Sequence, residues 1–384
     1  MTLDRRTLLA LFSLAFGLRI LYAVLLGSSP DMIAVHETYD YRTAAKMAAG
    51  VNWLTTPVSP SAPGYRALLA VAFKLVGTSW WTAVVLNALL GATTTLFLYR
   101  IGEQRLGRRV GLVAALWLGL YVNQIYFASV AGRHVLVTFL FVWFVYSLVR
   151  PFQRMRSAIW SAILYVALTY TEPMFLLLLP LVLVYLATWA THHRVLSIQY
   201  TFLFLTAVVL LNIPWTIRNY VVRRDVVLIS LEAAHYTRPI ARLLGGSPPE
   251  PPLAPGVTTT ERPGSGYETV EFWRVARFAD APGDARHGIA PEPAWSFRHN
   301  AASLANFGLL LPLFAVGVVA ACKRRHRAAL VLSGSIVGYA VLRGFYGAAE
   351  SARLPVEPLI ILVAFYGAKV LLDARRSGGQ SAGA

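Results

Sequence analysis

Long apolar runs recur along this chain and limit what it can fold into. Ten such runs follow one another, at residues 7–27, 80–99, 110–130, 135–149, 157–170, 174–190, 198–217, 302–321, 328–342 and 354–372. A helix that crosses a bilayer needs about 20 mostly apolar residues. Only 14% of the residues are charged, whereas a soluble domain has roughly a quarter. The sequence therefore predicts an all-α polytopic membrane protein with about ten transmembrane helices.

Basic residues gather in every second loop between these runs. If the N-terminus is cytoplasmic, the loops expected inside are 100–109, 150–156, 191–194, 322–327 and the tail from residue 373, and all of them contain arginine or lysine. In the short outer turns near Gly132 and Thr171, Arg133 is the only arginine or lysine. This asymmetry follows the positive-inside rule and predicts that both termini are cytoplasmic. It also accounts for much of the net charge of +17, so nucleic acid is not an expected partner.

The order of these runs divides the chain into three parts. Residues 1–222 form an N-terminal transmembrane module with an external loop at 28–79, residues 223–301 form an external region, and residues 302–384 contain the last spans and a cytoplasmic tail. Within the first loop, the apolar piece 65–76 follows three prolines and is too short to span, which favours an interfacial helix. The external region contains a proline-rich linker at 245–252 and a possible short helix at 267–278.

Acidic side chains in the first external loop are candidates for acid–base chemistry. Residues 35–49 have a helical pattern, so Glu37, Asp40 and Tyr41 share one helix face. A carboxylate here can serve as a general base or can simply favour the positive end of the helix. Asp31 is a third option for the base. Beside Glu37 lies His36, but no second histidine is spaced to complete a metal site, so no metal is expected.

Three motifs resemble known membrane enzymes. The first loop reads HETYDY at 36–41, followed by a small-residue helix that ends at Gly50 and by Pro-Gly-Tyr at 63–65. Residues 214–220 read PWTIRNY, and residues 352–358 read ARLPVEP. Their order is similar to that in GT-C membrane glycosyltransferases of the protein-mannosyltransferase and aminoarabinose-transferase branch. The resemblance implies a GT-C-like fold with interfacial helices in the first external loop.

The resemblance also implies an activity. Such enzymes transfer a sugar, with inversion, from a polyprenyl-phosphate-linked donor to a hydroxyl of a lipid, glycan or protein acceptor, at the external face of the bacterial inner membrane and without a cofactor. Glu37 or Asp40 is then the expected catalytic base, and Arg218, Asn219 and Arg353 are expected to bind the donor phosphate. The residues expected to bind substrate are His36, Tyr41, Tyr65, Trp215 and Glu350.

Two departures from the family pattern affect this interpretation. His36-Glu37 stands where the family usually has an aspartate, so a non-catalytic relative of the same fold is an alternative. The outer turns carry Arg133 and Glu172 with charges opposite to those in many members, which predicts that the two residues form an ion pair.

A transporter or lipid flippase is a further alternative, but hardly any ionisable group interrupts the spans. Arg19 lies within the first span and is expected to snorkel to its end.

Overall fold

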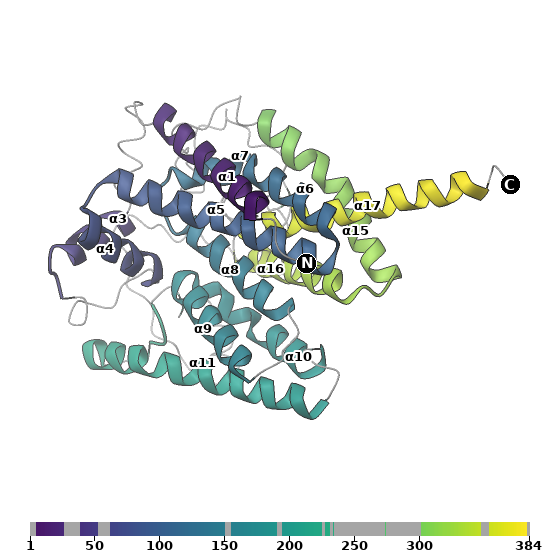
Figure 1. Cartoon of the computed structure of the whole chain (residues 1–384). Helices are drawn as coiled ribbons and strands as arrows, with labels where there is room; N and C mark the ends of the chain where they lie inside the picture. The colour runs from purple at the N-terminus through teal and green to yellow at the C-terminus, as the bar shows by residue number, and fades with distance from the viewer. Residues whose placement is uncertain are drawn as a thin grey trace. The chain divides into compact units, whose positions relative to one another are not determined.

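The computed structural model describes most of the chain. The described residues are 5–26, 39–52, 62–149, 155–189, 194–224, 227–230, 233, 273, 301–346 and 353–381. Within these ranges the regular elements are all helical, as the sequence predicts (Figure 1). The chain divides into two compact units: unit 1 comprises residues 1–34, 87–130 and 264–384, and unit 2 comprises residues 35–86 and 131–263.

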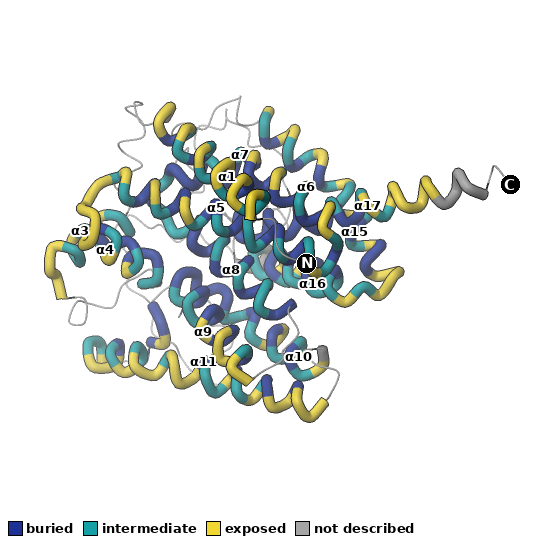
Figure 2. Tube along the Cα trace, in the orientation of Figure 1, coloured by how far each residue is buried: buried dark blue, intermediate teal, exposed yellow. Residues whose placement is uncertain are grey.

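Unit 1 contains the first helix of the chain and its last three long ones. Its elements are α1 (Arg5–Leu26), α5 (Trp80–Arg105) from residue 87 onward, α6 (Arg108–Gly119), α7 (Val122–Ala128), the π-helical turn η2 (Leu304–Gly308), α15 (Leu309–Lys323), α16 (Arg327–Tyr346) and α17 (Glu357–Ser381). α17 packs against α6, α15 and α16, while α1 packs against α6 and α7. Figure 2 shows that the first half of α17 is buried and that its later, described part is exposed.

Two glycines allow α15 and α17 to pack closely. A Cβ atom on Gly317 would collide with the carbonyl oxygen of Val363, and one on Gly367 would collide with that of Leu313. Small residues at such contacts let helix backbones approach within van der Waals distance, which is the main source of helix association in lipid. The glycines therefore fix how these two helices cross.

Arg19 of α1 is buried, and the expectation that it snorkels is wrong. Its side chain is 1% exposed, and Nη1 donates a 2.8 Å hydrogen bond to the carbonyl oxygen of Ala15. Gly91 of α5 lies against the guanidinium group, since a Cβ atom there would be only 2.5 Å from Nε. Residues 11, 15, 19 and 23 repeat every fourth position and are all buried, so Arg19 lies on the inner face of α1.

Unit 2 contains the helices between residues 39 and 76 and those of the middle of the chain. Its elements are α3 (Tyr39–Ala48), α4 (Gly64–Val76), the first turns of α5, α8 (His134–Val149), α9 (Arg156–Thr171), the 3₁₀ turn η1 (Pro173–Leu178), α10 (Leu179–Trp189) and α11 (Arg194–Arg223). α9 packs against α4, α8 and α11, and α3 packs against α4. α11 is exposed along much of its length, as expected for a helix that faces lipid (Figure 2).

Each of the ten ranges predicted to cross the membrane contains a helix. By length and composition, four helical stretches are able to span a bilayer, namely residues 5–25, α5, α11 and residues 301–323. α6 and α7 make a fifth if they are counted as one span bent by 51°. α8 and residues 173–188 are shorter apolar helices. The protein is therefore polytopic, and the full count of ten stays a prediction.

Two short helices, α3 and α4, lie where the sequence predicts helices between the first two long apolar runs. The helix expected at 65–76 is confirmed as α4, and α3 confirms the later part of the helix expected at 35–49. The interfacial position of α4 stays a prediction. Residues 35–38 and most of the helix expected at 267–278 lie outside the described residues. The three-part division by sequence order also stays a prediction.

Candidate functional site

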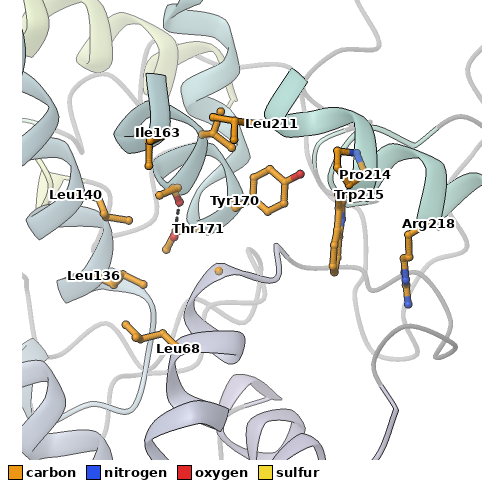
Figure 3. A pocket seen from close by; sticks show the side chains of 13 residues that line it. Leu68, Leu136, Leu140, Ile163, Tyr170, Thr171, Leu211, Pro214, Trp215 and Arg218 are labelled. Atoms are coloured by element: carbon orange, nitrogen blue, oxygen red, sulfur yellow. Dashed lines mark hydrogen bonds between the residues drawn. The ribbon is translucent and has the colours of Figure 1, made fainter. Parts of the chain in front are cut away.

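A pocket in unit 2 lies between four helices. Its volume is about 590 Å³. α4 contributes Gly64 and Leu68, α8 contributes Leu136 and Leu140, α9 contributes Ile163, Val166, Ala167, Tyr170 and Thr171, and α11 contributes Leu211, Pro214, Trp215 and Arg218. Nearly all of these side chains are apolar, and among the described lining residues Arg218 is the charged one (Figure 3). Such a pocket suits a hydrocarbon chain with an anionic end.

Aromatic rings lead from the apolar wall to Arg218. Tyr170 and Trp215 meet edge to face with ring centroids 5.9 Å apart, and the Arg218 guanidinium lies 5.2 Å from the Trp215 ring centroid. Figure 3 shows Trp215 between Tyr170 and Arg218. Because the contact with the indole ring restricts where the guanidinium lies, this arrangement preorganises a cation for an anionic ligand.

Asn219 and Trp215 fasten the segment after α11 to the helix. The Asn219 amide is fully buried and donates to the carbonyl oxygens of Val227 at 2.9 Å and Ile229 at 3.2 Å. Trp215 Nε1 donates to Ile229 at 2.8 Å, and Arg218 Nη1 donates to Asn219 Oδ1 at 2.9 Å. These contacts suggest that Asn219 orients Arg218. A direct contact between Asn219 and a donor phosphate stays a prediction.

The packing of α3 against α4 brings Asp40 to Arg66. Asp40 Oδ1 of α3 lies 3.6 Å from Arg66 Nε of α4, with side chains 18% and 5% exposed. Tyr41 packs edge to face on Phe73, with ring centroids 5.0 Å apart, and Tyr65 is buried. Arg66 is not among the site residues predicted from the sequence. A cation in the first turn of an otherwise apolar, non-spanning helix is the signal that could have indicated it.

The predicted ion pair between Arg133 and Glu172 is confirmed. Arg133 Nε lies 3.5 Å from Glu172 Oε2, and the Glu172 side chain is only 6% exposed. Arg133 immediately precedes α8 and Glu172 immediately follows α9, so the pair joins the ends of two helices that line the pocket. It therefore helps to set the spacing of the pocket walls.

We expect Glu172→Arg to lower the free energy of unfolding by about 1–3 kcal/mol, because it places like charges together in a mostly buried position. Arg133→Glu combined with Glu172→Arg should recover part of that loss. Thermal unfolding in detergent measures both effects. A harmless single variant, together with a double variant that gains nothing, would show that the pair contributes no stability.

Arg353 lies in unit 1, in a cluster around a buried carboxylate. Its Nε is 3.1 Å from Glu357 Oε1, and its guanidinium lies 3.7 Å from the Phe307 ring centroid. Glu357 is 1% exposed and also accepts hydrogen bonds from Asn123 at 2.9 Å and Gln124 at 3.2 Å. The cluster holds the start of α17 against α7, just after the break between α6 and α7.

The predicted site residues are thus distributed over both units. Asp40, Tyr41, Tyr65, Trp215, Arg218 and Asn219 belong to unit 2, and Arg353 belongs to unit 1. His36, Glu37, Glu350 and Asp31 lie outside the described residues. Tyr170 lines the pocket but was not identified in the sequence, since no pattern separates it from other tyrosines at helix ends. Among the described residues, no group of three histidine, cysteine or acidic side chains is placed to hold a metal ion.

Comparison with known proteins indicates the class of this fold. The family model for dolichyl-phosphate-mannose-protein mannosyltransferase matches residues 59–217, which include most of the pocket lining. ArnT from Cupriavidus metallidurans matches in its apo state and bound to undecaprenyl phosphate, at 13% and 14% identity, each with a TM-score of 0.59. The apo oligosaccharyltransferase of Archaeoglobus fulgidus matches at 13% identity with a TM-score of 0.60. The chain has the GT-C glycosyltransferase fold. The predicted resemblance is confirmed.

The GT-C likeness extends over nearly all of this chain but only part of the solved structures. The matches cover 91% of the chain and 59% of each ArnT structure, and 98% of the chain and 52% of the oligosaccharyltransferase. The comparison with curated proteins gives no match. Because the identities are low, the GT-C structures establish the fold, and the substrates of this chain are a matter for proposal.

Proposed function

We propose that this protein is an inverting glycosyltransferase that takes a sugar from a polyprenyl-phosphate-linked donor. The observation that carries the proposal is the apolar pocket of unit 2, which includes Arg218 stacked on Trp215. The pocket walls suit the first isoprene units of a lipid, and the guanidinium suits the phosphate. The match to ArnT bound to undecaprenyl phosphate supports a donor of this chemical class.

The reaction needs a base and a stabilised leaving group. A carboxylate, Glu37 or Asp40, takes the proton of the acceptor hydroxyl while its oxygen bonds to the anomeric carbon of the sugar. The bond from that carbon to the phosphate oxygen breaks, and the polyprenyl phosphate leaves with the electron pair. Arg218 stabilises the negative charge that develops on this phosphate. The predicted contact of Arg353 with a donor phosphate remains part of the proposal. The predicted contacts of His36, Tyr41, Tyr65 and Glu350 with substrate remain part of the proposal.

We also propose a location and topology. The protein crosses the bacterial inner membrane ten times, with both termini cytoplasmic and the reaction at the external face. The helices in all ten predicted ranges and the basic residues in the inner loops support this arrangement. The acceptor is a lipid, a glycan or a protein with an accessible hydroxyl.

Donor turnover by the full chain in nanodiscs tests the proposal. Wild type, Glu37→Gln and Asp40→Asn are incubated with a panel of polyprenyl-phosphate sugars, and free polyprenyl phosphate is followed by mass spectrometry. We expect wild type to release it and one carboxamide variant to lose ~10²–10⁴-fold in rate, the usual contribution of a general base. Rates that are unchanged in both variants would contradict a base in this loop. No release by wild type would favour the non-catalytic or transporter alternatives.

A further inference from the structure

Arg66 of α4 connects α3 with the helix wall of the pocket. It is 4% exposed, although it lies in the first turn of a helix next to an external loop, and it pairs with Asp40 of α3. The other described cations of these two helices, Arg42, Lys46 and Lys74, are exposed. A buried guanidinium beside a carboxylate favours the ionised form of that carboxylate and restricts its orientation.

The helix that carries Arg66 is also a wall of the pocket. Leu68 lines the pocket, and Gly64 lies against the end of α9, where a Cβ atom would be 2.5 Å from Thr171 Oγ1 and 2.8 Å from the carbonyl oxygen of Tyr170. α4 therefore has little freedom to shift along α9. The position of Arg66 is fixed by the same contacts that shape the pocket.

We infer that Arg66 is a positioning residue for the proposed transfer, and that Asp40 is the carboxylate it positions. The inference rests on the proposed function and narrows its choice of base. Asp40 of α3 pairs with a side chain of α4, the helix whose Leu68 lines the pocket. In this arrangement the acceptor hydroxyl gives its proton to Asp40 as its oxygen bonds to the anomeric carbon. Arg66 stays protonated throughout and touches neither sugar nor phosphate.

A mutant cycle on turnover tests this role. Arg66→Gln, Arg66→Lys, Asp40→Asn and the Arg66→Gln/Asp40→Asn double variant are assayed with the donor on which wild type is active. Lys74→Gln is the matched control, because it removes an exposed cation from the same helix. We expect Arg66→Gln to lower kcat ~10- to 100-fold with little change in the KM for the donor, as for a misplaced catalytic group. Arg66→Lys should recover part of the loss.

The double variant decides between positioning and independent effects. If Arg66 acts through Asp40, the double variant is no slower than Asp40→Asn alone. A raised KM with unchanged kcat in Arg66→Gln would instead make Arg66 a donor ligand, and losses that multiply in the double variant would make it independent of Asp40. An active Asp40→Asn, beside an inactive Glu37→Gln, would also overturn the inference. If Arg66→Gln does not fold, Arg66→Lys takes its place in the cycle.

The failure of this inference is distinct from that of the proposed function. Wild type that is inactive on every donor overturns the proposed function, and the inference falls with it. Wild type that is active, with an Arg66→Gln variant that folds and matches it in kcat, overturns the inference alone.

Discussion

Arg218→Gln is expected to raise the KM for the donor ~10- to 100-fold, since one or two hydrogen bonds to a charged group contribute about 1.5–3 kcal/mol. Among the described residues that line the pocket, Arg218 is the charged one, so this change removes the positive charge and leaves the apolar walls in place. kcat should fall as well, because the phosphate gains charge as it leaves. Donor titration of turnover in nanodiscs measures both constants.

The geometry around Arg218 makes a more specific version of this test possible. Arg218→Lys keeps the charge but loses the guanidinium contact with the Trp215 ring and the Nη1 hydrogen bond to Asn219, so its KM should lie between those of wild type and Arg218→Gln. Arg224→Gln is the control, since that side chain is exposed just beyond α11. A donor KM that is the same in wild type and Arg218→Gln would place the phosphate elsewhere.

Glu357→Ala is expected to lower the free energy of unfolding by ~3–5 kcal/mol, the usual cost of removing one partner of a buried ion pair. The substitution takes the carboxylate away from Arg353, which is 9% exposed, and from the amide groups of Asn123 and Gln124. Because these N–H donors are buried, they cannot form hydrogen bonds with water once the carboxylate is gone. Thermal unfolding of the purified protein in detergent measures the loss.

Glu103→Ala is the matched comparison for that result. Glu103 also pairs with an arginine, Arg100 at 3.7 Å, but the two side chains are 26% and 29% exposed. Removing this carboxylate breaks the partly exposed pair and the 2.9 Å hydrogen bond from Tyr99, which together should cost about 1–2 kcal/mol, less than for Glu357→Ala. Equal losses in the two variants would mean that the cluster around Glu357 contributes no more than an ordinary surface pair.

Helix positions could be predicted from the sequence because each follows from a local pattern. Apolar length marks every predicted span, and the prolines before Gly64 mark α4 as a short helix that does not span. The ion pair between Arg133 and Glu172 was also predictable, since both lie in short turns on the same side of the proposed membrane. These features depend on a few neighbouring residues or on topology alone.

Contacts between distant helices could not be predicted in the same way. The pairing of Asp40 with Arg66 depends on how α4 rests on α9, and the bonds from Asn219 go to a segment with no recognisable pattern. For Arg19, the position along α1 suggested an exposed end. Its burial depends on which face of the helix turns inward, which the spacing of Leu11, Ala15 and Ala23 indicates only once the neighbouring helices are known.

The burial of Arg19 also has a consequence for biogenesis. α1 is synthesised long before α5, so when it inserts its arginine meets lipid and water rather than Gly91. An arginine costs at most ~2.5–3.5 kcal/mol in an inserting helix, the value for the helix centre, and the strongly apolar remainder of α1 can offset this. Gly91 covers the cation only when α5 arrives, and α6 and α7, which pack against α1, follow later still. The docking of these later helices therefore completes the insertion of the first helix, and a nascent chain that stops before residue 91 should hold α1 less firmly in the membrane.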